Sequence, residues 1–216
     1  MIKVDFHTHS TASPDGGISA DGYRQLFQDG ILDCIAITDH NTVDLALQLH
    51  QELGDKIIVG EEIDTRSGEI VGLFLSQVVP AGLDLPVAIA AIHAQGGLVY
   101  VPHPFETVRK GIQKHDLDPL LKDLDIVEVY NGRAVAQNKG PEASVWARLN
   151  EIPGVASSDA HGRKGIGTAY TMIENMPTAT NLVAQLAKAK LTMERPPIHS
   201  LLYPKWHRLR ARLKKS

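Results

Sequence analysis

Histidine and carboxylate side chains stand in short, regularly spaced motifs along the chain. His7 and His9 are separated by one residue, and so are Asp159 and His161. Residues two apart in an extended strand point to the same face, so each pair can reach one metal ion together. Imidazole and carboxylate ligands in one site suit Zn, Mn or Fe better than Mg or Ca alone. The spacing therefore indicates a site for divalent cations.

The elements that position these motifs follow from short apolar runs that alternate with amphipathic segments. Runs rich in Val and Ile predict buried strands over residues 2–8, 34–38, 57–62, 69–75, 98–102, 126–130, 155–158 and 169–173. Helices are expected over residues 19–28, 42–53, 86–94, 118–124, 141–150 and 180–190. Ser19 and Asn41 are expected to cap the first two helices. This alternation predicts an α/β fold with a parallel sheet, either closed into a small barrel or open.

The candidate ligands gather at the predicted strand ends. The carboxyl ends of parallel strands share one face, and ligands of such folds bind there. Ligand-type residues follow five strands, in the motifs His7-Thr-His9, Asp39-His40, Glu61-Glu62, His103-Pro104 and Asp159-Ala-His161. Each motif alone has a structural explanation, such as a helix cap, a turn or a solvated face. Their coincidence on one face favours a shared metal site.

Six motifs occur in a characteristic order along the chain: His7-x-His9, Ser-Pro-Asp15-Gly, Thr38-Asp-His40, Gly60-Glu-Glu62-Ile, His103-Pro-Phe and Ser158-Asp159-Ala-His161. The ordered set resembles the PHP (polymerase and histidinol phosphatase) family of metal-dependent phosphoesterases, and the resemblance extends from the first strand to about residue 174. It implies a single domain folded as a distorted seven-stranded βα barrel. It also implies two or three divalent ions (Mn, Zn or Fe) at the carboxyl ends of the strands.

The resemblance further implies a role for each ligand. It assigns His7, His9 and Asp159 to the first ion, Glu62 as a bridge to the second, His103 to the second, and Asp15, His40 and His161 to the third. Glu69 departs from the family, because many members have a histidine at its position. Glu69 would serve as an oxygen ligand, or the second site would be weaker, so two ions are better supported than three. Glu62 is expected to bridge rather than Glu61, since the family pattern places an apolar residue on either side of that acid.

Phosphate ester hydrolysis is the reaction that this cluster predicts. Clustered divalent ions lower the pKa of a bound water toward ~7 and polarise a phosphoryl oxygen. Arg109 and Arg133 follow strand ends and are expected to bind the substrate, because a guanidinium matches the geometry of phosphate. The substrate would be a phosphorylated metabolite, a nucleotide or a short oligonucleotide.

Two other functions fit the same residues. A metal-dependent amidohydrolase-type enzyme would cleave C–N bonds in a comparable barrel, but it would not need arginines at the mouth of the pocket. A non-catalytic metal-binding regulatory module would show no turnover with metal added. The number of ligands argues against the second function, since a closed structural site needs fewer.

The composition is that of a globular protein and argues against disulfide-linked and membrane-spanning proteins. The net charge is −3 and 43% of the residues are hydrophobic, which is typical of a globular protein. Cys34 is the single cysteine, so an internal disulfide is excluded and a reducing, cytoplasmic location is expected. No apolar run reaches the ~18 residues of a membrane span, and no apolar leader begins the sequence.

The last 22 residues differ in charge from the rest of the chain. Residues 195–216 contain seven basic residues and no acidic one. We therefore expect a PHP-type catalytic domain over residues 1–194 and a basic tail over 195–216. Trp206, Leu209 and Leu213 have helical spacing and are expected to pack on the body, although contact with nucleic acid or an anionic membrane is the alternative. Because the body of the chain is acidic, we expect no dedicated nucleic-acid-binding domain. The charge and hydropathy patterns of the sequence do not specify an oligomeric state.

Overall fold

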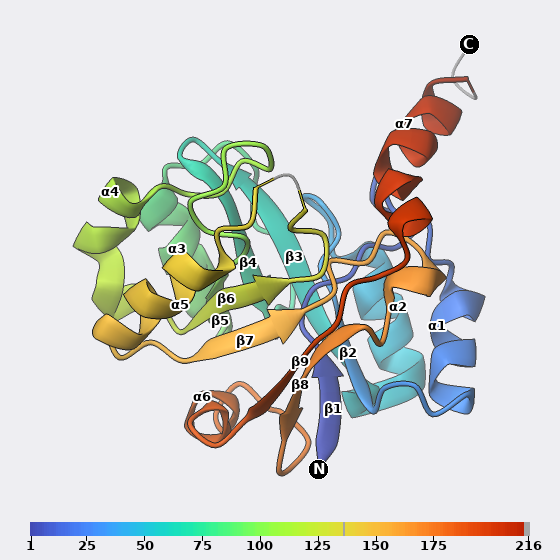
Figure 1. The fold of residues 1–216 in the computed structure, drawn as a ribbon, viewed down its shortest axis with the longest axis horizontal. Helices are drawn as coiled ribbons and strands as arrows, with labels where there is room; N and C mark the ends of the chain where they lie inside the picture. The colour runs from blue at the N-terminus through green and yellow to red at the C-terminus, as the bar shows by residue number, and fades with distance from the viewer. Residues whose placement is uncertain (136, 214–216) are drawn as a thin grey trace.

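The computed structural model describes residues 1–135 and 137–213, and for residues 210–213 it describes the backbone alone. The strands form a barrel-like sheet with helices around it (Figure 1). In the described chain the strands are β1 (Ile2–Asp5), β2 (Cys34–Ile37), β3 (Ile57–Thr65), β4 (Gly68–Leu73), β5 (Leu98–Val101), β6 (Ile126–Asn131), β7 (Gly154–Ser157), β8 (Ala169–Ile173) and β9 (Lys190–Met193). The helices are α1 (Ala20–Gln28), α2 (Asp44–Leu53), α3 (Leu85–His93), α4 (Lys114–Leu117), α5 (Gly140–Leu149), α6 (Leu182–Leu186) and α7 (Tyr203–Leu213). Short 3-10 helices span Gly54–Lys56, Asp118–Asp123, Arg163–Gly165 and Ile198–Leu202.

The sheet is mixed, whereas the sequence predicts a parallel one. The strand order is β7-β6-β5-β4-β3-β2-β1-β8-β9. β4 is antiparallel to both β3 and β5, and β8 is antiparallel to β1 and β9. The reason at β4 is the connection length, because the two residues between β3 and β4 can form a hairpin turn but cannot form a crossover.

The strand count also differs from the expected seven. Nine strands are present among the described residues, since β9 adds an edge that the sequence pattern did not indicate. Residues 180–190 are predicted as one helix, but α6 occupies five residues and the chain then pairs with β8 from Lys190 onward. Pairing with an open sheet edge outweighs the local helix preference here. The predicted helix over 118–124 is a 3-10 helix that follows α4.

The sheet curves until β7 meets β8. The Ala156 N–H donates to Thr171 Oγ1 at 3.0 Å, and the Thr171 hydroxyl donates to the Ala156 carbonyl oxygen at 3.0 Å. Beyond the strand ends, the His9 N–H donates to the Ala160 carbonyl oxygen at 2.9 Å. The segments that follow β1 and β7 therefore meet, and the barrel is nearly closed on the side where the candidate ligands begin.

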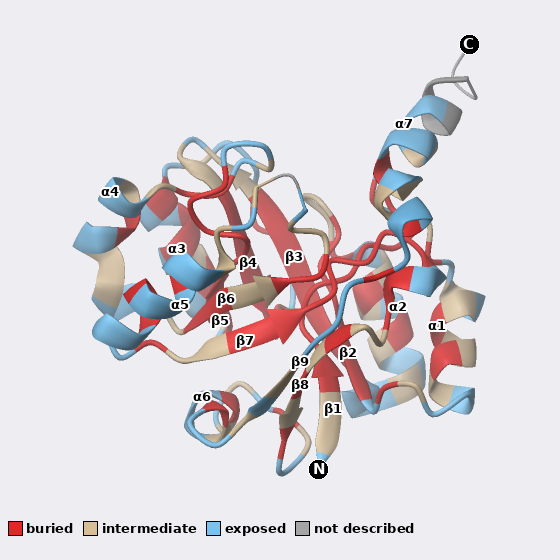
Figure 2. Cartoon of the chain, in the orientation of Figure 1, coloured by how far each residue is buried: buried red, intermediate tan, exposed pale blue. Residues whose placement is uncertain are grey.

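Two apolar clusters hold the barrel and its helices together. Along β2, Cys34 and Ala36 belong to one cluster, while Ile35 and Ile37 belong to the other. The cluster that contains Cys34 takes residues from every strand from β1 to β8, so it fills the barrel, and Leu182 of α6 also belongs to it. The second cluster joins the outer face of the sheet to α1, α2, α3 and α5. Figure 2 shows this as buried strands between helices that expose one face.

The two predicted helix caps have different outcomes. Ser19 caps α1, since its hydroxyl oxygen accepts from the Gly22 N–H at 3.1 Å. Asn41 does not cap α2, which begins at Asp44. Instead, Asn41 Nδ2 donates to Asp64 Oδ2 and Asn41 Oδ1 accepts from the Asp64 N–H, both at 2.9 Å. Asn41 therefore ties the end of β2 to β3.

The C-terminal segment forms α7, which extends away from the sheet (Figure 1). The expectation that Trp206 and Leu209 pack on the body is wrong, because 54% and 57% of their surfaces are exposed. The helix approaches the body closely at Tyr203 and His207. The predictions for the Leu213 side chain and for Lys214 and Lys215 lie outside the described residues. Among those described, no helix has the length and apolar character needed to cross a bilayer.

Candidate metal centre

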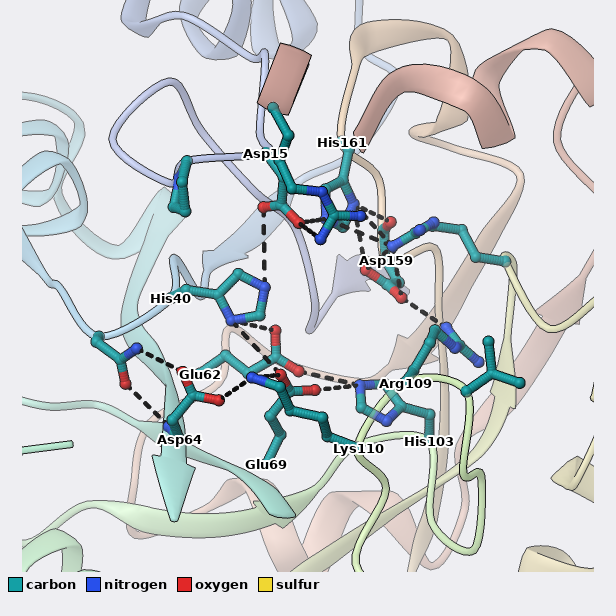
Figure 3. A pocket seen from close by; sticks show the side chains of 15 residues that line it. Asp15, His40, Glu62, Asp64, Glu69, His103, Arg109, Lys110, Asp159 and His161 are labelled. Carbon is teal, nitrogen blue, oxygen red and sulfur yellow. Dashed lines mark hydrogen bonds and ion pairs between the residues drawn. The ribbon is translucent and has the colours of Figure 1, made fainter. Parts of the chain in front are cut away.

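A pocket of roughly 300 Å³ lies beyond the carboxyl ends of the barrel strands. Figure 3 shows histidines, carboxylates and basic side chains converging on it from separate loops. The structure brings together eight of the nine predicted metal ligands in three overlapping groups, within each of which the donor atoms lie within 4.8 Å of one another. The groups are His7, His9 and Asp159; His7, Glu62 and His103; and His9, Asp15, His40 and His161.

The group around His7 and His9 forms at the end of β1. His7 Nε2 and His9 Nε2 are 3.1 Å apart, as expected for alternate residues of an extended segment. Asp159, which follows β7, places Oδ1 3.4 Å from His9 Nε2 and 3.8 Å from His7 Nε2. All three side chains are buried. The three side chains come together because the segments that follow β1 and β7 meet.

Glu62 lies at the centre of the cluster. Its Oε2 is 3.3 Å from His9 Nε2 and 3.4 Å from His40 Nδ1, and its Oε1 is 3.0 Å from His103 Nε2. The two carboxylate oxygens of Glu62 therefore face different histidines of the cluster. Glu61 points elsewhere on the same strand, where its Oε2 accepts from the Val79 N–H at 2.8 Å. Burial raises the pKa of Glu61 to about 7.

The third group lies near the mouth of the pocket. Asp15 comes from the turn after β1, and its carboxylate oxygens are 3.5 Å from His161 Nε2 and 3.8 Å from His40 Nε2. His9 stacks between the two other histidines, with ring centroids 4.1 Å from His161 and 4.9 Å from His40. Three imidazoles and one carboxylate thus face one point from three loops.

Glu69 lies at the edge of the cluster and in none of the three groups. Its Oε2 is 3.7 Å from His103 Nε2, and its Oε1 is 3.4 Å from Lys110 Nζ. Burial, together with the charge of Glu62, raises the pKa of Glu69 to about 8. A protonated carboxyl is a weak metal ligand, so the site near His103 has fewer strong donors among the described residues.

The electrostatics of the pocket suit bound cations. Burial lowers the pKa of His7, but the charges of Asp159 and Glu62 outweigh it and raise that pKa well above its usual value. The field therefore favours positive charge beside these carboxylates. Burial, followed by the charge of Arg133, lowers the pKa of His161 to about 3, which leaves a neutral imidazole able to ligate. Nδ1 of His9 and of His103 are buried without a hydrogen-bond partner among the described residues. This donor set fits divalent Mn, Zn or Fe.

The backbone turns sharply where two of these residues leave their strands. His103 has a φ of 28° and Asp159 a φ of 50°, in the left-handed region that non-glycine residues rarely adopt. Such conformations cost about 1–3 kcal/mol each and persist where surrounding contacts enforce them. At His103 that contact is Glu128, whose Oε2 accepts from the His103 N–H at 2.6 Å. Part of the backbone strain of the protein therefore lies in two segments that carry candidate ligands into the pocket.

The two predicted phosphate-binding arginines both line the pocket, and both contact Asp159. Arg109 Nη1 is 2.7 Å from Asp159 Oδ2, and the same guanidinium donates to both carboxylate oxygens of Glu106. Arg133 Nη1 is 3.3 Å from Asp159 Oδ1 and 3.1 Å from His161 Nδ1. The arginines therefore stand beside the ligands, within reach of an anion in the pocket.

Sequence reasoning missed four residues that build the site. Glu128 is fully buried on β6, and Tyr100 OH donates to its Oε1 at 2.7 Å while His7 Nδ1 lies 3.3 Å from the same oxygen. Its signal is an acid inside the apolar run Ile-Val-Glu-Val. The others are Asp64, Lys110 and Arg208, which line the pocket. No local pattern distinguishes them from surface charges.

Comparisons with known proteins agree with this geometry. A PHP-associated family model matches residues 141–191. An uncharacterized protein of Methanocaldococcus jannaschii is 34% identical over 179 residues, which cover 78% of this chain and 69% of that protein. A second uncharacterized protein of the same organism is 34% identical over 147 residues, 60% of this chain and 82% of that protein.

Solved structures share the fold at lower identity. A two-domain protein of Bacteroides vulgatus, named for a predicted PHP-like metal-dependent phosphoesterase, superimposes with a TM-score of 0.72 and 21% identity, over 96% of this chain and 69% of that one. An amidohydrolase of Chromobacterium violaceum gives a TM-score of 0.61 and 14% identity, over 93% and 96% of the two chains. At these sequence identities, the structural similarity shows a shared fold and nothing more specific. Together with the family model and the sequence relatives, they place the chain in the PHP (polymerase and histidinol phosphatase) family.

Proposed function

We propose that the protein hydrolyses phosphate mono- or diesters with the help of two or three divalent ions (Mn, Zn or Fe). The substrate would be a phosphorylated metabolite, a nucleotide or a short oligonucleotide, and residues 1–194 would form the catalytic domain. The observation that supports this most is the combination of a buried histidine–carboxylate cluster with guanidinium groups in one pocket. A cation site alone needs no arginine, whereas a phosphate ester needs both.

The side chains of the pocket would divide the work between metal binding and substrate binding. Bound divalent ions would supply an activated water and polarise a phosphoryl oxygen. Glu62 is placed to hold two ions near each other, because its two oxygens face different histidines. Arg133 is placed to bind phosphoryl oxygens, since its guanidinium lines the pocket beside His161. Arg109 would contribute a second charge and hold the Asp159 carboxylate in place.

Metal analysis followed by an activity panel tests the proposal. The full chain, loaded with Mn²⁺ or Zn²⁺, would be assayed against phosphomonoesters and phosphodiesters. His9→Ala should lower kcat/KM by more than ~100-fold, because His9 belongs to two of the donor groups. His93→Ala is the matched control, since His93 pairs with Asp125 outside the pocket. Equal activity of the two variants would overturn the site assignment.

A metal-dependent C–N hydrolase is the second candidate. The structural likeness to an amidohydrolase supports it, as does the donor set, which would serve an amide equally well. The arginines separate the two reactions, because an amide carbonyl carries no charge for Arg133 to neutralise. Arg133→Ala should raise the KM for a phosphate ester by a larger factor than the KM for an amide. A panel that finds amide turnover and no phosphate release would favour this second reaction, and no turnover of either kind would favour a regulatory metal-binding module.

A further inference from the structure

Helix α7 packs directly on two loops of the metal centre. A Cβ atom at Gly17 would overlap the imidazole of His207, and a Cβ atom at Gly162 would overlap the ring of Tyr203. Gly17 lies two residues after Asp15, and Gly162 follows His161. The helix is therefore seated on the segments that present two candidate ligands, with glycines making room for its aromatic side chains.

This packing places Arg208 at the pocket. Arg208 Nη1 is 3.5 Å from Asp15 Oδ2, and Arg208 lines the pocket together with His40, His161 and Arg133. Asp15, which Arg208 contacts, also lies 3.5 Å from His161 Nε2, and Arg133 Nη1 is 3.1 Å from His161 Nδ1. The guanidinium groups of Arg208 and Arg133 therefore both line the part of the pocket that holds Asp15 and His161.

Arg208 differs from the other two pocket arginines in how much of it is accessible. The side chains of Arg109 and Arg133 are 14% and 19% exposed, and both contact Asp159 at 3.3 Å or less. The Arg208 side chain is 54% exposed, and its one ion pair within the described chain is the 3.5 Å contact with Asp15. A guanidinium has five N–H donors, so most of those on Arg208 are available to an incoming anion.

We propose that α7 forms one wall of the active site and that Arg208 is a third anion-binding residue, which contacts a phosphoryl group of the substrate. This inference rests on the proposed phosphoesterase function for the identity of the anion. The surrounding charge supports it, because the segment from 195 to 216 has seven basic residues and no acidic one. Two described side chains of α7, Lys205 and Arg208, are basic, and their charge would favour the approach of an anion.

Binding of inorganic phosphate tests the role of Arg208 without requiring turnover. The Mn²⁺-loaded full chain would be titrated with phosphate by calorimetry as wild type, Arg208→Ala, Arg208→Lys and Lys205→Ala. Lys205 is the matched control, since it removes one positive charge from the exposed surface of the same helix outside the pocket lining. Arg208→Ala should weaken phosphate binding about tenfold, equivalent to ~1.4 kcal/mol. Lys205→Ala should stay within about twofold, and Arg208→Lys should fall between the two.

The outcomes separate this inference from the proposed function. Equal phosphate affinity in Arg208→Ala and Lys205→Ala would overturn the role of Arg208, as would a wild-type protein that binds no phosphate. If the wild-type protein hydrolyses no phosphate ester while phosphate affinity falls only in the Arg208 variants, that result would contradict the proposed reaction but support Arg208 as an anion-binding residue. If Arg208→Ala hydrolyses the phosphate ester with an unchanged KM, the proposed reaction would stand and the proposed role of Arg208 would be wrong.

Discussion

Three buried carboxylates outside the donor groups hold the strand ends in place. Asp5 Oδ1 accepts from the Ser158 N–H at 3.0 Å, Asp39 Oδ1 from the Ser10 N–H at 2.6 Å, and Glu128 Oε2 from the His103 N–H at 2.6 Å. Each bond joins the backbone of a candidate ligand, or of the residue next to one, to a side chain on or just after another strand. These buried hydrogen bonds hold in place the segments that carry the candidate ligands.

Glu128 has a testable effect on metal affinity through His7. Its Oε1 lies 3.3 Å from His7 Nδ1, an arrangement that would keep Nε2 deprotonated toward the pocket. Glu128→Gln should therefore weaken Mn²⁺ binding about 10–100-fold, the usual effect of losing such a partner. Metal titration would measure this, with Tyr100→Phe as the milder control because it removes a single bond to Glu128. An unchanged affinity in Glu128→Gln would show that His7 is held by packing alone.

Cys34 is expected to be unreactive in the folded protein. Its side chain is fully buried in β2, and burial raises the pKa of the thiol well above its usual range. The thiolate is the reactive form, and the raised pKa means that the Cys34 thiol should stay protonated even at pH 9. A thiol reagent such as DTNB should label one cysteine per chain in denaturant and react only slowly in its absence. Rapid labelling of the native protein at pH 8 would contradict the buried position.

At the scale of elements, the loop between β5 and α4 positions Arg109 at the pocket. The segment between β5 and α4 returns on itself, because the Gly111 N–H donates to the Glu106 carbonyl oxygen at 2.8 Å and the Phe105 N–H donates to the Ile112 carbonyl oxygen at 3.1 Å. This closed loop contains Arg109, whose guanidinium is held by the side chain of Glu106. The hydrogen bonds within this loop therefore hold the Arg109 guanidinium at the pocket.

Gly111→Ala should open this loop. A Cβ atom there would collide with the His103 carbonyl oxygen and lie 2.9 Å from the backbone N and O of Glu106. We expect a loss of roughly 1–3 kcal/mol in the free energy of unfolding, as for overpacking elsewhere. The KM for a phosphate ester should also rise as Arg109 is displaced. Urea unfolding and steady-state kinetics would measure both, and Gly22→Ala in α1, away from the pocket, should leave the KM unchanged. A wild-type KM in Gly111→Ala would show that the loop adapts.

At the scale of the whole molecule, metal binding should stabilise the fold. The donor groups join β3 to the segments after β1, β2, β5 and β7, so one cluster links most of the barrel. An ion at 100 times its dissociation constant adds ~2.7 kcal/mol to stability. For a chain of this size that corresponds to a rise in Tm of about 5–10 °C. Thermal unfolding with Mn²⁺ and with a chelator would measure the rise, and Mg²⁺ should give less because the donors include five histidines. Identical Tm values with Mn²⁺ and chelator would contradict a shared metal centre.

Local patterns in the sequence determined the residue types and the strand ends of the candidate site. The alternate spacing of His7 and His9 is a property of any extended chain, and the apolar runs before His40, His103 and Asp159 mark buried strands without reference to their neighbours. The presence of β9, the inward side of Glu62 and the positions of Glu128 and Arg208 were decided by the tertiary structure. These features depend on which segments pair and how the sheet closes, and contacts between residues more than a hundred positions apart leave no periodic signal in the sequence.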